Sequence, residues 1–140
     1  METKKKIQFI RIILLSNGVV DLLAAIALFF PVFQISLPGY ASYTNQFAFI
    51  AGGWGIAAFT FGIGRIWASY KFELYWFMVI LGLLEGVLLS LYSLINVFFL
   101  EISLLQVVLP LSVGSVYGIL YFIALLFLFR LDKPAKYRGK

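Results

Sequence analysis

The sequence predicts an all-α membrane protein, a bundle of four transmembrane helices with both termini in the cytoplasm. Of its 140 residues, 63% are hydrophobic and only 12% are charged, whereas soluble domains average about 45–50% apolar and about 25% charged residues. The apolar residues form four runs, each longer than the roughly 20 residues that span a bilayer. The Lys and Arg residues lie near those ends of the runs that are predicted to face the same side of the membrane. We therefore expect residues 1–140 to form a single transmembrane domain.

The first predicted helix covers residues 7–33, with Pro31 near its end. A signal peptide is the competing interpretation, but its apolar core has only about 7–15 residues, so we expect a retained helix. The other three predicted helices cover residues 47–70, 74–100 and 104–131.

The segments between these helices are short, which leaves no room for a domain outside the membrane. The first loop, residues 34–46, is uncharged, whereas the second connection contains Lys71 and Glu73. Residues 101–103 form the third connection, and residues 132–140 form a basic tail.

The distribution of positive charge predicts the orientation. Cytoplasmic segments of membrane proteins carry an excess of Lys and Arg. The first and third connections have neither residue type, so both termini and the second connection are predicted to face the cytoplasm. The membrane is predicted to be the plasma membrane. The cations on that side are Lys4, Lys5, Lys6, Arg11, Arg65, Lys71, Arg130, Lys133, Lys136, Arg138 and Lys140.

Small residues recur at helical spacing in three of the predicted helices. In lipid, helices associate through close approach over small residues and through interhelical hydrogen bonds. The pattern predicts a tightly packed four-helix bundle with one face left for an oligomer. The glycines predicted at helix contacts are Gly55, Gly62, Gly82, Gly86, Gly114 and Gly118.

Three ionisable residues, Asp21, Arg65 and Glu85, lie inside the apolar runs. Even on lenient scales, a charge at bilayer depth costs about 2.5–3.5 kcal/mol. At 1.5 Å per residue, the Asp21, Glu85 and Arg65 backbones lie roughly 16, 15 and 7 Å from the inner boundary. The long Arg65 side chain can extend toward the middle, so we expect the three groups to meet. Asn17, one turn before Asp21, is predicted to share its hydrogen bonds.

This buried polar cluster has two interpretations that are compatible with each other. The guanidinium of Arg65 has a forked set of donors that can bridge two carboxylates, which makes the cluster a stabilising ion network. Alternatively, Asp21 or Glu85 is a proton-coupled or substrate-binding acid, because one arginine cannot neutralise two carboxylates.

Several functions are disfavoured by composition. The chain has no Cys and no His, which excludes thiol nucleophiles and cysteine metal sites and His-ligated haem. No catalytic or phosphate-binding motif is present, so we predict no enzyme activity, no metal and no cofactor. The net charge of +5 is explained by topology, so nucleic acid is not an expected partner.

Two segments resemble the small DoxX-like and BphX-like four-helix membrane proteins. They are Asn17-Gly18 through Pro31, and Gly52-Gly53 through Gly62-Ile-Gly64-Arg65. Some members of that broad group look like accessory subunits of quinone-linked respiratory complexes. The resemblance implies an accessory or uncharacterised membrane protein and transfers no site residue.

The sequence therefore leads to three functional hypotheses. The first is an accessory or interaction protein of the bilayer, acting as a homo-oligomer or with a membrane-complex partner, whose Asp21–Arg65–Glu85 cluster stabilises the bundle. The alternative is a small transporter or a binder of a small lipophilic ligand, such as a quinone, that uses Asp21 or Glu85. The third, a membrane enzyme, is disfavoured because the motifs of four-helix transferases and the histidines of sterol isomerases are missing.

Overall fold

The computed structural model describes residues 3–30, 45–99 and 102–131, and every long element in these ranges is an α-helix. The four long helices are α1 (Thr3–Phe29), α3 (Asn45–Ala68), α4 (Tyr75–Phe99) and α5 (Leu104–Leu131). A short 3₁₀-helix, η1 (Phe72–Leu74), precedes α4. All four long helices are long and apolar enough to cross a membrane, which indicates a multi-pass membrane protein and confirms the predicted helical bundle.

Helix α1 lies toward the N-terminus of its predicted range, residues 7–33. It begins at Thr3, so the lysines of its first turns are helical. It ends at Phe29, and Phe30 is no longer helical. A residue that precedes proline is disfavoured in the α conformation, and Pro31 follows Phe30.

The connection between α3 and α4 is a tight turn. Helix α3 ends two residues earlier than predicted, because Ser69 and Tyr70 already belong to the turn. In this turn the Tyr70 amide donates to the Trp67 carbonyl at 3.1 Å. The Tyr75 hydroxyl donates to the Ser69 carbonyl at 2.9 Å, which joins the end of α3 to the start of α4.

The other helix boundaries differ little from the prediction, and α3 begins at Asn45, two residues earlier than predicted. Helix α4 starts one residue later than predicted, and helix α5 covers residues 104–131 as predicted. Several predictions fall outside the described residues: the end of the first predicted helix (31–33), most of the first loop (34–44), residues 100–101 and the basic tail, residues 132–140.

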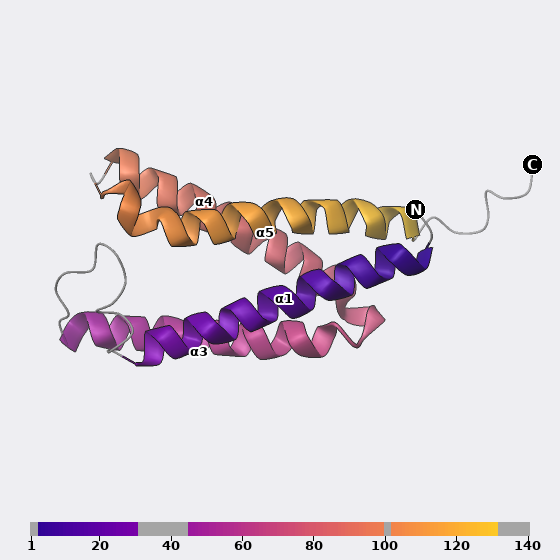
Figure 1. The fold of residues 1–140 in the computed structure, drawn as a ribbon, viewed down its shortest axis with the longest axis horizontal. Coiled ribbons are helices and arrows are strands. Elements are labelled where there is room, and N and C mark those ends of the chain that lie inside the picture. Colours follow the sequence, from indigo (N-terminus) through magenta and orange to yellow (C-terminus); the bar gives the residue numbers. More distant parts are fainter. Residues whose placement is uncertain (1–2, 31–44, 100–101, 132–140) are drawn as a thin grey trace, which may run out of the picture.

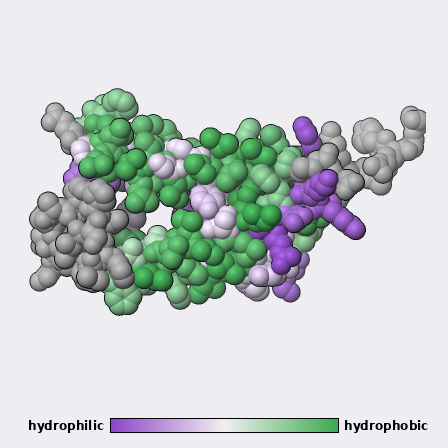
Figure 2. Space-filling view, viewed as in Figure 1, coloured by the Kyte–Doolittle hydropathy of each residue, from purple (hydrophilic) through white to green (hydrophobic). Residues whose placement is uncertain are grey.

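The bundle consists of two helical hairpins. Helix α1 packs along α3, and α4 packs along α5, whereas the two pairs contact each other much less. The pairs meet at the end of the molecule that holds the N-terminus and diverge toward the other end (Figure 1). Hydrophilic residues gather at the end where the hairpins meet, and an opening separates the hairpins farther along the bundle (Figure 2).

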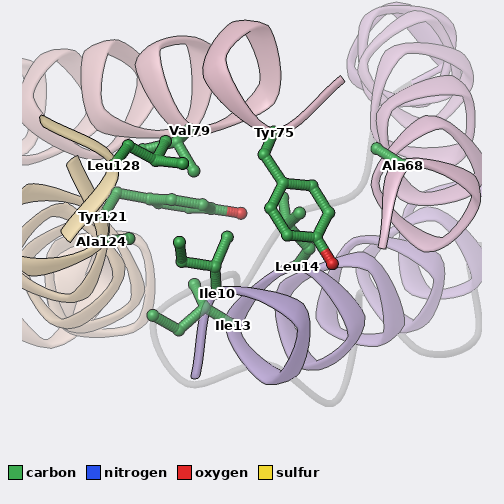
Figure 3. Close-up of a cluster of buried hydrophobic side chains, with 9 residues drawn as sticks. All are labelled: Ile10, Ile13, Leu14, Ala68, Tyr75, Val79, Tyr121, Ala124 and Leu128. Carbon is green, nitrogen blue, oxygen red and sulfur yellow. The ribbon is translucent and has the colours of Figure 1, made fainter. Parts of the chain in front are cut away.

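A hydrophobic core closes the end where the hairpins meet. Its buried side chains come from all four long helices (Figure 3). They are Ile10, Ile13, Leu14, Ala68, Tyr75, Val79, Tyr121, Ala124 and Leu128. This core holds the two hairpins together at one end.

Candidate functional site: an ion cluster between the hairpins

Arg65 of α3 lies between two carboxylates. Its Nη1 donates to Oδ2 of Asp21 on α1, and its Nη2 donates to Oε2 of Glu85 on α4. Arg65 is fully buried, with 0% of its side chain exposed. We call Asp21, Arg65 and Glu85 the ion cluster. It joins the α1–α3 hairpin to the α4–α5 hairpin, because Glu85 belongs to the latter.

Asn17 orients one side of the ion cluster. Its Nδ2 donates to Oδ1 of Asp21 at 3.2 Å, one turn along α1. Asn17 is itself buried. Asp21 therefore accepts from Asn17 through one oxygen and from Arg65 through the other, and only 12% of its side chain is exposed.

Tyr121 of α5 adds the fourth helix to the site, and it was not among the predicted site residues. It is fully buried and lies close enough to interact electrostatically with Arg65, Asp21 and Glu85. Its ring extends from α5 into the space between α4 and α1 (Figure 3). Sequence alone offered one signal for it: a tyrosine in the middle of an apolar span instead of at an interface.

Gly82 explains how the Tyr121 ring reaches this position. A Cβ at Gly82 would overlap the Tyr121 ring. The ring therefore passes across α4 where that helix has no side chain. The sequence predicted Gly82 at a contact between helices. In the structure, its missing side chain leaves room for the Tyr121 ring.

Two polar atoms of the site have no hydrogen-bond partner. Among the described residues, the buried side-chain polar atoms without a hydrogen-bond partner are Nε of Arg65 and the hydroxyl of Tyr121. An unsatisfied buried donor costs about 1–3 kcal/mol, so both atoms are suited to bind an oxygen acceptor such as water. Both belong to the same site, which distinguishes it from the rest of the described bundle.

Glu85 differs from Asp21 in its exposure. Although it pairs with Arg65, 45% of its side chain is exposed. Its position on α4, ten residues after Tyr75 and fourteen before Phe99, places it roughly 15 and 21 Å from the two ends of the helix. The ion cluster is thus reachable from outside the protein near the middle of a span.

The remaining predicted glycines lie at contacts within each hairpin. A Cβ at Gly62 would lie 2.9 Å from the carbonyl oxygen of Gly18 on α1, and one at Gly55 would lie 3.1 Å from the Phe29 ring. Gly18 is also a close contact, and the sequence analysis did not predict it.

In the second hairpin the contact is between backbones. A Cβ at Gly86 would lie 2.7 Å from the Cα of Gly118 and 2.8 Å from the carbonyl oxygen of Gly114. Ser90 and Ser115 extend this contact with a hydroxyl pair at 3.2 Å. Each hairpin therefore has its own small-residue interface.

The described part of the chain contains no group of three or more acidic, His or Cys residues that could hold a metal ion. What the site offers is one guanidinium, two carboxylates and a phenol, contributed by four different helices. Comparison of the chain with family models, with curated proteins and with solved structures finds no match.

Proposed function

We propose that this chain is a small interaction protein of the plasma membrane, with both termini cytoplasmic, that acts by binding another molecule within the bilayer and not by catalysis. The observation that carries the proposal is the position of Glu85. A glutamate whose side chain is 45% exposed near the middle of an apolar helix is costly to leave against hydrocarbon. A molecule that covers this carboxylate removes that cost.

The cytoplasmic orientation is supported by the described cations. Lys4, Lys5, Lys6 and Arg11 lie in the first three turns of α1, Lys71 lies in the connection between α3 and α4, and Arg130 lies in the last turn of α5. Hydrophilic residues gather at the end where the hairpins meet (Figure 2). Positive charge is enriched in cytoplasmic segments. At this end the Arg11 guanidinium carbon lies 4.7 Å from the ring centroid of Tyr70.

Two kinds of molecule fit the proposal. An accessory role in a membrane complex, which the resemblance to DoxX-like proteins implies, requires a partner protein. A lipophile-binding role requires a small molecule, and the opening between the hairpins (Figure 2) favours it.

Native mass spectrometry of the purified full chain tests the proposal. A bound species that is present in stoichiometric amounts, and is lost in Glu85→Gln, supports it, and its mass tells a partner protein from a small molecule. Glu73→Gln is the matched control, because Glu73 is exposed in η1. Identical spectra for wild type and Glu85→Gln would contradict the proposal.

A further inference from the structure

The charge of the ion cluster indicates what kind of group covers Glu85. With all three residues ionised, the single guanidinium of Arg65 faces two carboxylates, which leaves one negative charge in excess. The other Lys and Arg residues in the described ranges lie at or near the end where the hairpins meet. Compensation therefore comes either from a proton or from a cation that the chain itself does not supply.

The surroundings of the excess charge suit an organic cation. The Phe61 ring, 5.7 Å from the guanidinium carbon of Arg65, is 37% exposed. Tyr92, two turns beyond Glu85 on the same face of α4, is also exposed. Aromatic faces attract cations electrostatically. The fully buried Tyr121 hydroxyl has no hydrogen-bond partner, and its oxygen, with free lone pairs, lies within electrostatic range of the two carboxylates.

A second copy of this chain does not fit this role. The one deep cation among the described residues is Arg65, which is fully buried and already paired with two carboxylates. Two Glu85 carboxylates facing each other would repel. The occupant is therefore a different molecule.

We propose that Glu85 and Asp21 together bind a lipophilic organic cation, which reaches the ion cluster from the bilayer through the opening between the hairpins. This inference rests on the proposed function and specifies the class of its ligand. Glu85 is the contact carboxylate, because it is the exposed one. Asp21 contributes the second negative charge, which makes the net charge of the ion cluster negative despite the positive charge of Arg65.

The test uses the purified full chain in lipid nanodiscs and a pair of probes of similar size and shape. Tetraphenylphosphonium is the cation, and triphenylphosphine oxide is a neutral molecule that offers a hydrogen-bond acceptor. Equilibrium binding should favour the cation. At an effective dielectric constant of 20, a charge pair at 4 Å is worth several kcal/mol, so a preference of at least about tenfold is expected.

Two substitutions separate charge from structure. Glu85→Gln removes the contact carboxylate. Asp21→Asn leaves Glu85 in place but brings the net charge of the ion cluster to zero. Each should weaken cation binding about tenfold or more, whereas Glu73→Gln should leave it unchanged. Thermal unfolding of each variant shows whether the protein is still folded.

The outcomes are distinguishable from those of the proposed function. Equal binding of both probes, or cation binding that survives Glu85→Gln, overturns the cation inference. Preferred binding of the phosphine oxide also overturns it, and shows that the donors of Arg65 and Tyr121 dominate instead. In either case a Glu85-dependent species in native mass spectra would keep the proposed function and reject only the cation.

Discussion

At the scale of single residues, Arg65 is the side chain on which the site depends. It is fully buried and pairs with acids of two other helices. Glu85 is the most exposed member of the ion cluster. The energetic consequence is asymmetric: removing one partner of a buried ion network leaves uncompensated charge, whereas replacing the whole network with apolar residues is often neutral.

This asymmetry predicts the effect of Arg65→Ala. The substitution leaves Asp21 and Glu85 without their cation, and we expect a loss of about 3–5 kcal/mol in stability. The triple variant Asp21→Leu, Arg65→Leu, Glu85→Leu should recover much of that loss. Thermal unfolding in detergent measures both. Arg11→Ala is the control, because Arg11 is exposed, and an equal effect of Arg11→Ala and Arg65→Ala would refute the role of the ion cluster.

The Tyr121 ring and its hydroxyl are predicted to have different effects. Tyr121→Phe keeps the ring over Gly82 and removes a buried hydroxyl that has no protein partner, so we expect no loss of stability and a gain of up to about 1–3 kcal/mol. Tyr121→Ala removes a fully buried ring and should cost about 3–5 kcal/mol. The same unfolding assay compares them. If Tyr121→Phe were as harmful as Tyr121→Ala, the hydroxyl would have a partner essential to the fold.

At the scale of helices, the molecule has two interfaces built from small residues, one in each hairpin. Gly18 and Gly62 bring α1 close to α3, and Gly86 and Gly118 bring α4 close to α5. Close backbone approach of this kind takes the place of the hydrophobic effect, which is missing between helices in lipid.

The prediction for these interfaces compares two glycines. Gly86→Ala places a methyl group 2.7 Å from the Gly118 backbone, and overpacking of this kind costs about 1–3 kcal/mol. At Gly53 a Cβ meets nothing within 4 Å, so Gly53→Ala should be neutral or stabilise by up to about 1 kcal/mol. Thermal unfolding of the two variants in parallel is the measurement. Equal tolerance would mean that α4 and α5 are not in backbone contact.

At the scale of the whole molecule, two hairpins meet at a hydrophobic core and at the ion cluster and diverge beyond them (Figure 1). The hairpins contact each other little, and an opening lies between them (Figure 2); we propose that the ion cluster is reached through it. The positively charged end is the same end at which the hairpins meet, so the opening is predicted to lie toward the outer half of the bilayer.

The orientation can be tested with single cysteines, since the chain has none of its own. Lys5→Cys and Lys71→Cys should be protected in intact cells from a membrane-impermeant maleimide, because both lie on the predicted cytoplasmic side. Ser103→Cys, exposed at the start of α5, should be labelled. Permeabilised cells provide the control, in which all three react. Labelling of Lys71→Cys in intact cells would contradict the proposed topology.

The sequence by itself determined the four helices, because the hydrophobic length needed to cross a bilayer is a local property of each run. It also indicated that Asp21, Arg65 and Glu85 should meet, because charges at bilayer depth need partners. The helix boundaries were predicted less accurately. Helix α1 begins at Thr3 instead of residue 7, because its lysines are helical, and it ends at Phe29 instead of residue 33.

Tertiary structure decided what no local pattern contains. Three-dimensional packing pairs α1 with α3 and α4 with α5, brings the Tyr121 ring over Gly82, and leaves Glu85 half-exposed while Asp21 is covered. These features depend on which helix faces which, and residues far apart in the chain set that choice together. Exposure, which only the tertiary structure determines, distinguishes the two acids and is the basis on which we propose Glu85 as the contact residue.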